Sequence, residues 1–119
     1  MSVDDFNRYS SMKLFMHNIY EFQKGVRNLV LCTTSAGCAK LVCERLDGLG
    51  IGYLTQQVSG GDQVNLYFGN GNCLDAVRTF VHKPLNELTP EEDFILGTML
   101  GYEITRQCER YCKRKQQTA

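Results

Sequence analysis

Two short and almost entirely apolar runs, each followed at once by residues that start helices, constrain the fold of this chain most strongly. Residues 28–33 (NLVLCT) and 64–68 (VNLYF) have the length and composition of buried strands. The hydroxyl residues Thr34 and Ser35 follow the first run, and Asn70-Gly71-Asn72 follows the second. Such residues are typical of helix N-termini and turns. This order of strand and helix signals predicts an α+β domain.

A first hairpin is predicted near the start of the chain. Residues 13–22 (KLFMHNIYEF) are rich in aromatic and β-branched side chains, which favours a strand. The turn at Gln23-Lys24-Gly25 would pair this strand with residues 28–33. Residues 1–11 are polar and are predicted to form a flexible N-terminal tail, so residues 12–119 are expected to be a single α+β domain.

Three helices are predicted from apolar periodicity and capping residues. Apolar side chains at helical spacing predict a first helix that ends near Gly48 and a second that covers about Cys73 to His82. The strongest local signal is Thr89-Pro90-Glu91-Glu92, in which Thr89 caps, Pro90 suits the first helical position and Glu92 returns to the cap. It predicts one long helix over residues 90–114.

These elements suggest a specific arrangement. Residues 51–58 are predicted as an edge strand that forms a second hairpin with residues 64–68. A compact solution places the strands 28–33 and 64–68 side by side and parallel in the centre of a sheet, with the helices on one face. The predicted fold is a two-layer sandwich of permuted ferredoxin-like order ββαββα, with an additional long C-terminal helix.

In that arrangement the two shorter helices begin at the same edge of the sheet. Converging helix N-termini favour an anion and lower the pKa of a nearby thiol. Cys38 and Cys73 are therefore the candidates for a reactive thiol. Caps and turns also explain the polar residues of this edge without any ligand. The candidate anion-binding residues are Thr34, Ser35, Gly37, Asn70, Gly71 and Asn72.

The six cysteines are predicted to be reduced, because most fall in periodic apolar segments and the polar amino terminus does not resemble a secretory signal. Cys108 and Cys112 lie four residues apart on one face of the long helix, a spacing that offers two ligands to a soft metal if partners come from elsewhere. The chain has no Cys-x-x-Cys motif. The alternative is that the cysteines are small buried apolar side chains.

The long helix carries a seam with three- and four-residue spacing that includes two glycines. Phe94, Gly97, Gly101 and Ile104 are its first members. Because glycine is unfavourable inside a helix, two glycines on one seam suggest a close approach of another backbone. The partner is predicted to be the sheet of the same chain, a second copy across a two-fold axis, or both, so a homodimer is expected.

The balance of acidic and basic residues argues against two classes of partner. The 13 basic and 13 acidic residues give a formal net charge of zero, so neither a nucleic-acid partner nor a membrane partner is expected. Glu91, Glu92 and Asp93 are explained by the start of a helix, and no catalytic triad is recognisable from spacing. We therefore expect no catalytic residue and no cofactor.

Two segments, MKLFMHNIYEFQKGVRNLVL and KPLNELTPEEDFILGTMLGYEITRQCERYCKR, resemble a family of bacterial proteins of unknown function of about this length. The resemblance covers about Met12 to Arg114 and implies a bacterial, cytoplasmic protein with no established activity. It also implies a flavodoxin-type partner and an electron-transfer or iron-related setting. Residues 31–68 are similar in topology to small thiol-carrier domains, but their Cys-Gly site has no counterpart here.

Two functions remain open on this basis. The first is a non-enzymatic binding or regulatory module, homodimeric, with a small anion site at the helix starts. The alternative is a thiol-dependent redox or metal-binding accessory protein linked to flavodoxin or iron metabolism.

Overall fold

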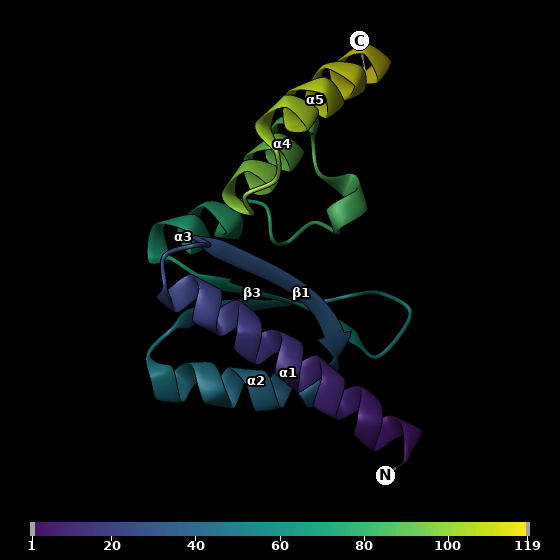
Figure 1. The fold of residues 1–119 in the computed structure, drawn as a ribbon. Helices are drawn as coiled ribbons and strands as arrows, with labels where there is room; N and C mark the ends of the chain where they lie inside the picture. Colours follow the sequence, from purple (N-terminus) through teal and green to yellow (C-terminus); the bar gives the residue numbers. More distant parts are fainter. Residues whose placement is uncertain (1, 119) are drawn as a thin grey trace.

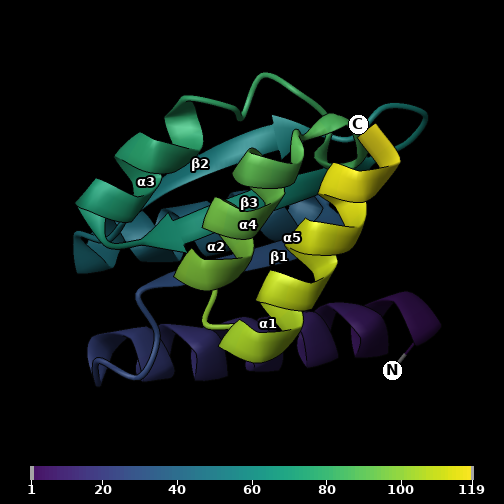
Figure 2. The ribbon, with the colours of Figure 1, turned by 90° about the horizontal axis from the view of Figure 1, so that it is seen from above.

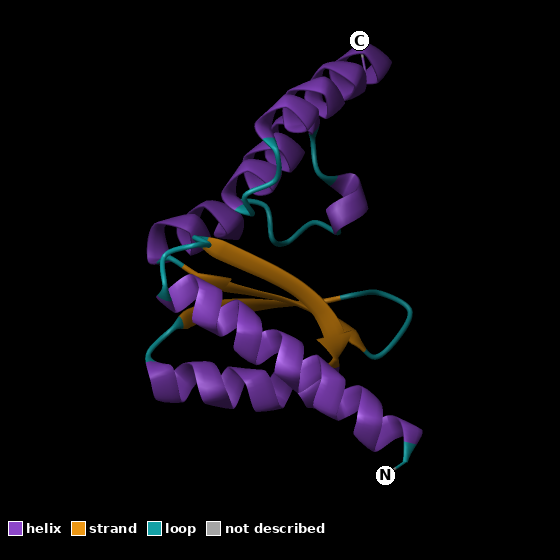
Figure 3. Cartoon of the chain, in the orientation of Figure 1, coloured by secondary structure: helices purple, strands orange, loops and turns teal. Residues whose placement is uncertain are grey.

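The computed structural model describes residues 2–118. It confirms an α+β protein in which a three-stranded sheet is surrounded by five α-helices within that range (Figures 1 and 3). The elements in chain order are α1 (Val3–Gln23), β1 (Leu29–Ser35), α2 (Ala36–Leu49), β2 (Gly52–Gln57), β3 (Gln63–Gly69), α3 (Gly71–Arg78), η1 (Leu85–Glu87), α4 (Pro90–Met99) and α5 (Ile104–Thr118).

The first element is a helix, so the predicted strand at residues 13–22 is wrong. Residues 3–11, expected to be a flexible tail, are the first turns of the same helix, and the Ser2 side chain caps it by accepting from the Asp5 N–H. Phe15 and Ile19 are buried, and Met12 and Phe22 pack beside them. These four residues follow helical spacing, and burial of that stripe outweighs the strand preference of the individual residues.

The sheet has the order β1-β3-β2, and β3 is antiparallel to both of its neighbours. Strands β1 and β3 are adjacent, as predicted, but they are not parallel, since Leu29 pairs with Gly69 and Ser35 with Gln63. β1 and β2 therefore run in the same direction on either side of β3, with α2 as the crossover. The four-stranded ferredoxin-like arrangement is not found in the described residues.

Helices cover both faces of the sheet (Figures 1 and 2). The sequence predicted the two shorter helices on one face and the long C-terminal helix or a second copy on the other, whereas α2 and α3 lie on opposite faces. The first face packs against α1 and α2 through a core that contains Val30, Leu66 and Phe68. The second face packs against α3 and α4 through Leu29 and Tyr67. This alternation of neighbouring residues between two cores is the two-residue period of a strand buried on both sides.

The predicted long C-terminal helix is two helices. Gly101 has φ +83°, a left-handed conformation that glycine adopts at low cost, and it ends α4. The Glu103 carboxylate then accepts from the N–H groups of Thr105 and Arg106 and starts α5. In Figure 1, α5 projects from the sheet. The radius of gyration is 15.4 Å, against roughly 13.5 Å for a compact chain of this length.

Candidate functional site

The composite anion site expected from the sequence is not formed. Because β1 and β3 are antiparallel, α2 begins at one end of the sheet and α3 at the other. The side chain of Ser35 caps α2 by accepting from the Cys38 N–H at 3.3 Å, and that of Asn70 caps α3 by accepting from the Asn72 N–H at 2.9 Å. The candidate residues are thus split into Thr34, Ser35, Gly37 and Cys38 at one end and Asn70, Gly71, Asn72 and Cys73 at the other.

The cysteines are dispersed. Cys38 is buried, Cys73 is half-buried against the second core, and Cys108 and Cys112 are exposed on α5. Within residues 2–118, no three His, Cys, Asp or Glu side chains are grouped so that they could hold a metal ion. Burial raises the pKa of the thiols of Cys32 and Cys43, which disfavours the reactive thiolate form.

The seam residues have two different roles. Gly97 is buried because the carboxamide of Gln107 in α5 lies directly against it, so its close neighbour is a side chain of the same chain and not another backbone, as the sequence had suggested. Phe94 packs against Tyr111 of α5 with ring centroids 5.5 Å apart. Gly101 forms the turn between α4 and α5, where a Cβ atom would meet nothing within 4 Å, so close packing does not explain this glycine. Ile104 is exposed.

A large open feature lies over the second face of the sheet, where α3, η1 and the α4–α5 pair leave part of the strands uncovered. It consists of two hollows that share Leu85 and Asn86, and we call it the sheet groove. The apolar hollow has a volume of about 480 Å³ and the polar hollow about 720 Å³. Both volumes lie in the range of small-molecule sites.

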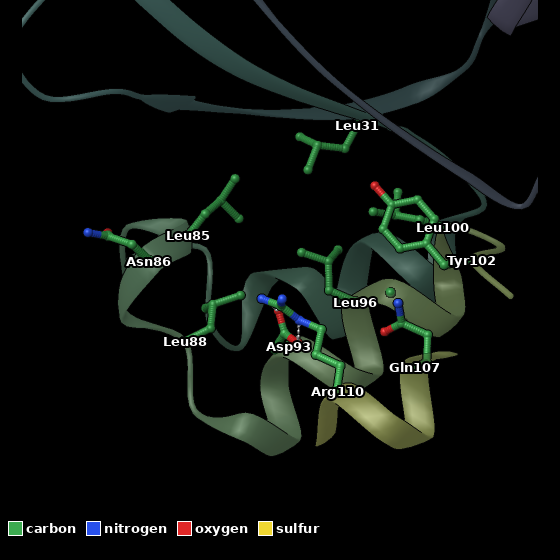
Figure 4. Close-up of a pocket in the computed structure, with 11 residues that line it drawn as sticks. Leu31, Leu85, Asn86, Leu88, Asp93, Leu96, Leu100, Tyr102, Gln107 and Arg110 are labelled. Carbon is green, nitrogen blue, oxygen red and sulfur yellow. Dashed lines mark hydrogen bonds and ion pairs between the residues drawn. The ribbon is translucent and has the colours of Figure 1, made fainter. Parts of the chain in front are cut away.

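The apolar hollow lies between β1 and the α4–α5 pair, as Figure 4 shows. Leu31 of β1 forms its roof in that view, Leu96 of α4 faces it from the opposite side, and Leu100, the C-cap residue of α4, lies beside Tyr102. Leu85 and Leu88 close the hollow along the η1 segment. Five polar side chains complete the wall: Asn86, Asp93, Tyr102, Gln107 and Arg110.

The polar hollow has a row of hydrogen-bonded side chains as its floor. Thr33, Asn65 and Gln56 are direct neighbours across β1, β3 and β2. The Thr33 hydroxyl donates to Asn65 Oδ1 at 2.6 Å, and Asn65 Nδ2 donates to Gln56 Oε1 at 2.9 Å. Gln56 Nε2 then donates to the carbonyl oxygens of Val81 and Lys83, both at 2.6 Å. This chain fixes both amide orientations and holds the segment after α3 over the sheet.

Gln107 differs from that row because its side chain is buried without a partner. The residue is 8% exposed, and its Oε1 is the one fully buried side-chain nitrogen or oxygen in the described part of the chain that lacks a hydrogen bond. A buried polar atom without a partner lowers stability by about 1–3 kcal/mol. The residue lines the apolar hollow, but its Oε1 faces Gly97, so a bound molecule would reach this oxygen only after the carboxamide turned toward the hollow.

The charged groups at the wall of the apolar hollow are paired with each other. Arg110 binds Asp93 through two contacts, Nε to Oδ2 at 2.7 Å and Nη2 to Oδ1 at 3.2 Å, and this carboxylate raises the pKa of Arg110. Arg114 Nη1 lies 3.6 Å from the same carboxylate, and its Nη2 donates to the Leu88 carbonyl oxygen at 2.8 Å. Asp93 and Arg110 balance each other in the lining of the hollow, and Arg114, which lies behind them and does not line it, brings the net charge of this group of three to +1.

Two residues in the sequence could have indicated a polar site in the sheet groove. Asn65 is a polar residue inside an otherwise apolar strand run, and Gln107 is a polar residue on the face of α5 that meets Gly97. Neither signal could be placed without knowing that helices cover both faces of the sheet.

Comparison with known proteins gives a family and no activity. A family described as "Protein of unknown function (DUF2023)" matches residues 13–114. No curated protein matches the chain. No helix in residues 2–118 is both long enough and apolar enough to cross a membrane.

Proposed function

The chain belongs to the DUF2023 family of proteins of unknown function, and we propose that it is a binding module that holds a small organic molecule in the sheet groove. The observation that carries this proposal is the buried, unpaired carboxamide of Gln107 in the wall of the apolar hollow. Natural structures pair almost all of their buried polar atoms, so an exception beside a hollow indicates a partner that binds there.

The lining of the sheet groove defines the class of ligand. The leucines at positions 31, 85, 96 and 100 suit an apolar body, and the Gln107 carboxamide suits a hydrogen-bonding group on that body. The polar hollow suits a hydroxylated or amide-bearing end, because Thr33 and Gln56 keep acceptor capacity beyond the bonds they make. The excess positive charge near Arg110 disfavours a cationic ligand.

The same lining supports binding rather than catalysis. His82 is the one histidine that lines the groove, and no cysteine among the described residues lines either hollow. Asp93 is held by two arginines and so is not available as a base. Within the described residues, His82 forms no hydrogen bond with the hydroxyl of Thr33 or Ser59, which line the same hollow, so the hydrogen-bonded nucleophile and base that are usual in covalent catalysis are not formed.

The probe 8-anilinonaphthalene-1-sulfonate has an apolar ring system and one anionic group, so it matches the apolar hollow and the net positive charge of the group formed by Asp93, Arg110 and Arg114. We expect saturable binding by calorimetry. Leu31→Trp fills the hollow and should weaken binding at least tenfold. Leu41→Trp makes the same change at an exposed leucine of α2 outside the groove and should leave it unchanged. Equal affinity of the two variants would rule out the groove as the binding site.

We also propose that two copies associate through α4 and α5. An open groove of about 450 Å³ on this helix pair is lined almost entirely by exposed or half-exposed apolar and thiol side chains, namely Phe94, Ile95, Cys108, Tyr111 and Cys112. In a dimer with two-fold symmetry, the same surface of a second protomer would pack against this groove and cover it. Cys108 and Cys112 line this groove, so a metal bound by these two thiols would lie in the proposed dimer interface.

The flavodoxin-type partner stays a prediction.

Sedimentation tests this association. The unmodified protein is expected to sediment as a dimer and Ile95→Glu as a monomer, because a charge would be buried in the interface. Leu14→Glu, at an exposed leucine of α1, should remain a dimer. A monomeric unmodified protein, or a dimeric Ile95→Glu variant, would refute the interface.

A further inference from the structure

We propose that the N-terminal end of α2, together with Arg8 and Thr34, binds the phosphate group of a small phosphate monoester. The site is a hollow of about 470 Å³ at the end of β1, beside α1 and the start of α2, and we call it the α2 hollow. Thr33 lines both this hollow and the polar hollow of the sheet groove, and the two share no other lining residue. Arg8 and Ser11 reach the α2 hollow from α1, and the end of β1, the first turn of α2 and Gln63 of β3 form the rest.

The backbone at this end of α2 favours an anion. The helix has 14 residues and no acidic residue in its first turn, so nothing in the helix neutralises the partial positive charge of its N-terminus. Ser35 satisfies the Cys38 N–H, and the Asp62 carbonyl oxygen accepts from the Ala36 N–H at 3.0 Å. The Gly37 N–H makes no hydrogen bond with the described residues and is exposed.

Thr34 provides an independent indication of a ligand. The residue is 8% exposed, and its side chain lines the α2 hollow and makes no hydrogen bond with any residue that the structure describes. Its hydroxyl oxygen is not among the fully buried unpaired atoms, so it still opens to the hollow. A buried hydroxyl without a protein partner is costly unless a ligand or water accepts its proton.

Arg8 supplies the charge. Arg27, Arg78 and Arg110 each form an ion pair with a carboxylate, whereas Arg8, like Arg45 and Arg106, forms none with the side chains that the structure describes, which do not include that of Asp4. Among the side chains that the structure describes, no carboxylate lines the α2 hollow. The fork of N–H donors on Arg8 matches the oxygens of a phosphate group, which Lys or a neutral side chain would match less well.

The volume of the α2 hollow decides between two sources of phosphate. A bare phosphate ion has five heavy atoms and would occupy a small part of about 470 Å³. The hydroxyls of Ser11 and Ser35 and the amide of Gln63 line the remaining space, so they can hydrogen-bond a small polar body attached to the phosphate. A phosphate monoester therefore fits better than inorganic phosphate.

Titration of the full chain, followed by the amide NMR signals of Gly37 and Cys38, tests the proposal. Glycerol 3-phosphate should shift both signals saturably, inorganic phosphate should bind more weakly, and glycerol should not bind. Arg8→Gln and Thr34→Val should each weaken glycerol 3-phosphate binding, Arg8→Gln about tenfold or more. Arg45→Gln changes an exposed α2 arginine outside the hollow and should bind as the unmodified chain does.

Three results would overturn the proposal. The first is the absence of a saturable shift at Gly37 and Cys38. The second is an equal loss of affinity in Arg8→Gln and Arg45→Gln, which would indicate only general electrostatic attraction. The third is equal affinity for inorganic phosphate and glycerol 3-phosphate, which would remove the monoester as the ligand.

Discussion

Gln107 shows at the scale of single residues how a stability cost can mark a binding site. Its buried Oε1 has no hydrogen-bond partner among the described residues, whereas the buried amide of Asn65 is bonded on both sides. A leucine at position 107 would fill similar space next to Gly97 without the unpaired atom. Glutamine at this position lowers the stability of the fold, and binding of a ligand by the carboxamide would explain why it is present.

This contrast gives a paired prediction. Gln107→Leu should raise the free energy of unfolding by about 1 kcal/mol, because an unpaired buried group is removed, and it should weaken binding of the anilinonaphthalene probe. Asn65→Leu should lower the free energy of unfolding by about 1–3 kcal/mol, because it leaves the hydrogen-bonding groups of Thr33 and Gln56 without their partner. Urea unfolding measures both. A destabilised Gln107→Leu variant would show that the carboxamide is structural.

Single residues also show how far the sequence could predict the site. The close approach at Gly97 was predictable from a glycine inside a helical seam, but its partner, Gln107, was not, because the helix break at Gly101 was not recognised. Thr34 and Ser35 were predicted as anion-binding residues from their place before a helix. Arg8 was missed, because residues 1–11 were interpreted as a tail rather than as part of α1.

At the scale of elements, local capping was the most predictable feature. The capping box at Thr89 and Glu92 is present as predicted, and α4 begins at Pro90. The first element was predicted wrongly, because the aromatic content of residues 13–22 was weighed above the helical spacing of Phe15, Ile19 and Phe22. The direction of β1 relative to β3 was also wrong, since strand pairing depends on contacts between residues far apart in the sequence.

Two carboxylates in the first turn of α4 make the stability of the folded state depend on pH. The Lys83 ammonium, 2.8 Å from Glu92, lowers the pKa of Glu92, with a further contribution from the Thr89 N–H. Lys115 of α5 lowers the pKa of Glu91 in the same way. A carboxyl whose pKa is lower in the folded state contributes stability above its ordinary pKa, near about 4.3, and loses that contribution as the pH falls through the lowered value.

We therefore predict that the melting temperature falls as the pH is lowered from about 5 to 3, and that Glu92→Gln makes this fall less steep. Glu87→Gln, at an exposed glutamate of η1 that forms no ion pair within the described chain, should leave the slope unchanged. Thermal melting of the three proteins at several pH values gives the comparison. Identical slopes for Glu92→Gln and the unmodified protein would contradict the role given to Lys83.

At the scale of the whole molecule, the second face of the sheet explains why the chain has an open site. The first face is covered along its length by α1 and α2, whereas the second is covered by the short α3, by η1 and by α4, with α5 directed away from the strands (Figures 1 and 2). The uncovered part of the strands becomes the sheet groove. The family match gives no activity, so the groove is the best physical guide to function.

Amide NMR signals of the full chain, followed during titration with 8-anilinonaphthalene-1-sulfonate, test the central claim most directly, because they locate the probe on the molecule. The account predicts saturable shifts at Leu31, Leu96 and Gln107, which line the apolar hollow. Shifts confined to Ile95 and Cys112, on the open groove of α4 and α5, would contradict it, because the probe would then mark the proposed dimer surface and leave the sheet groove empty.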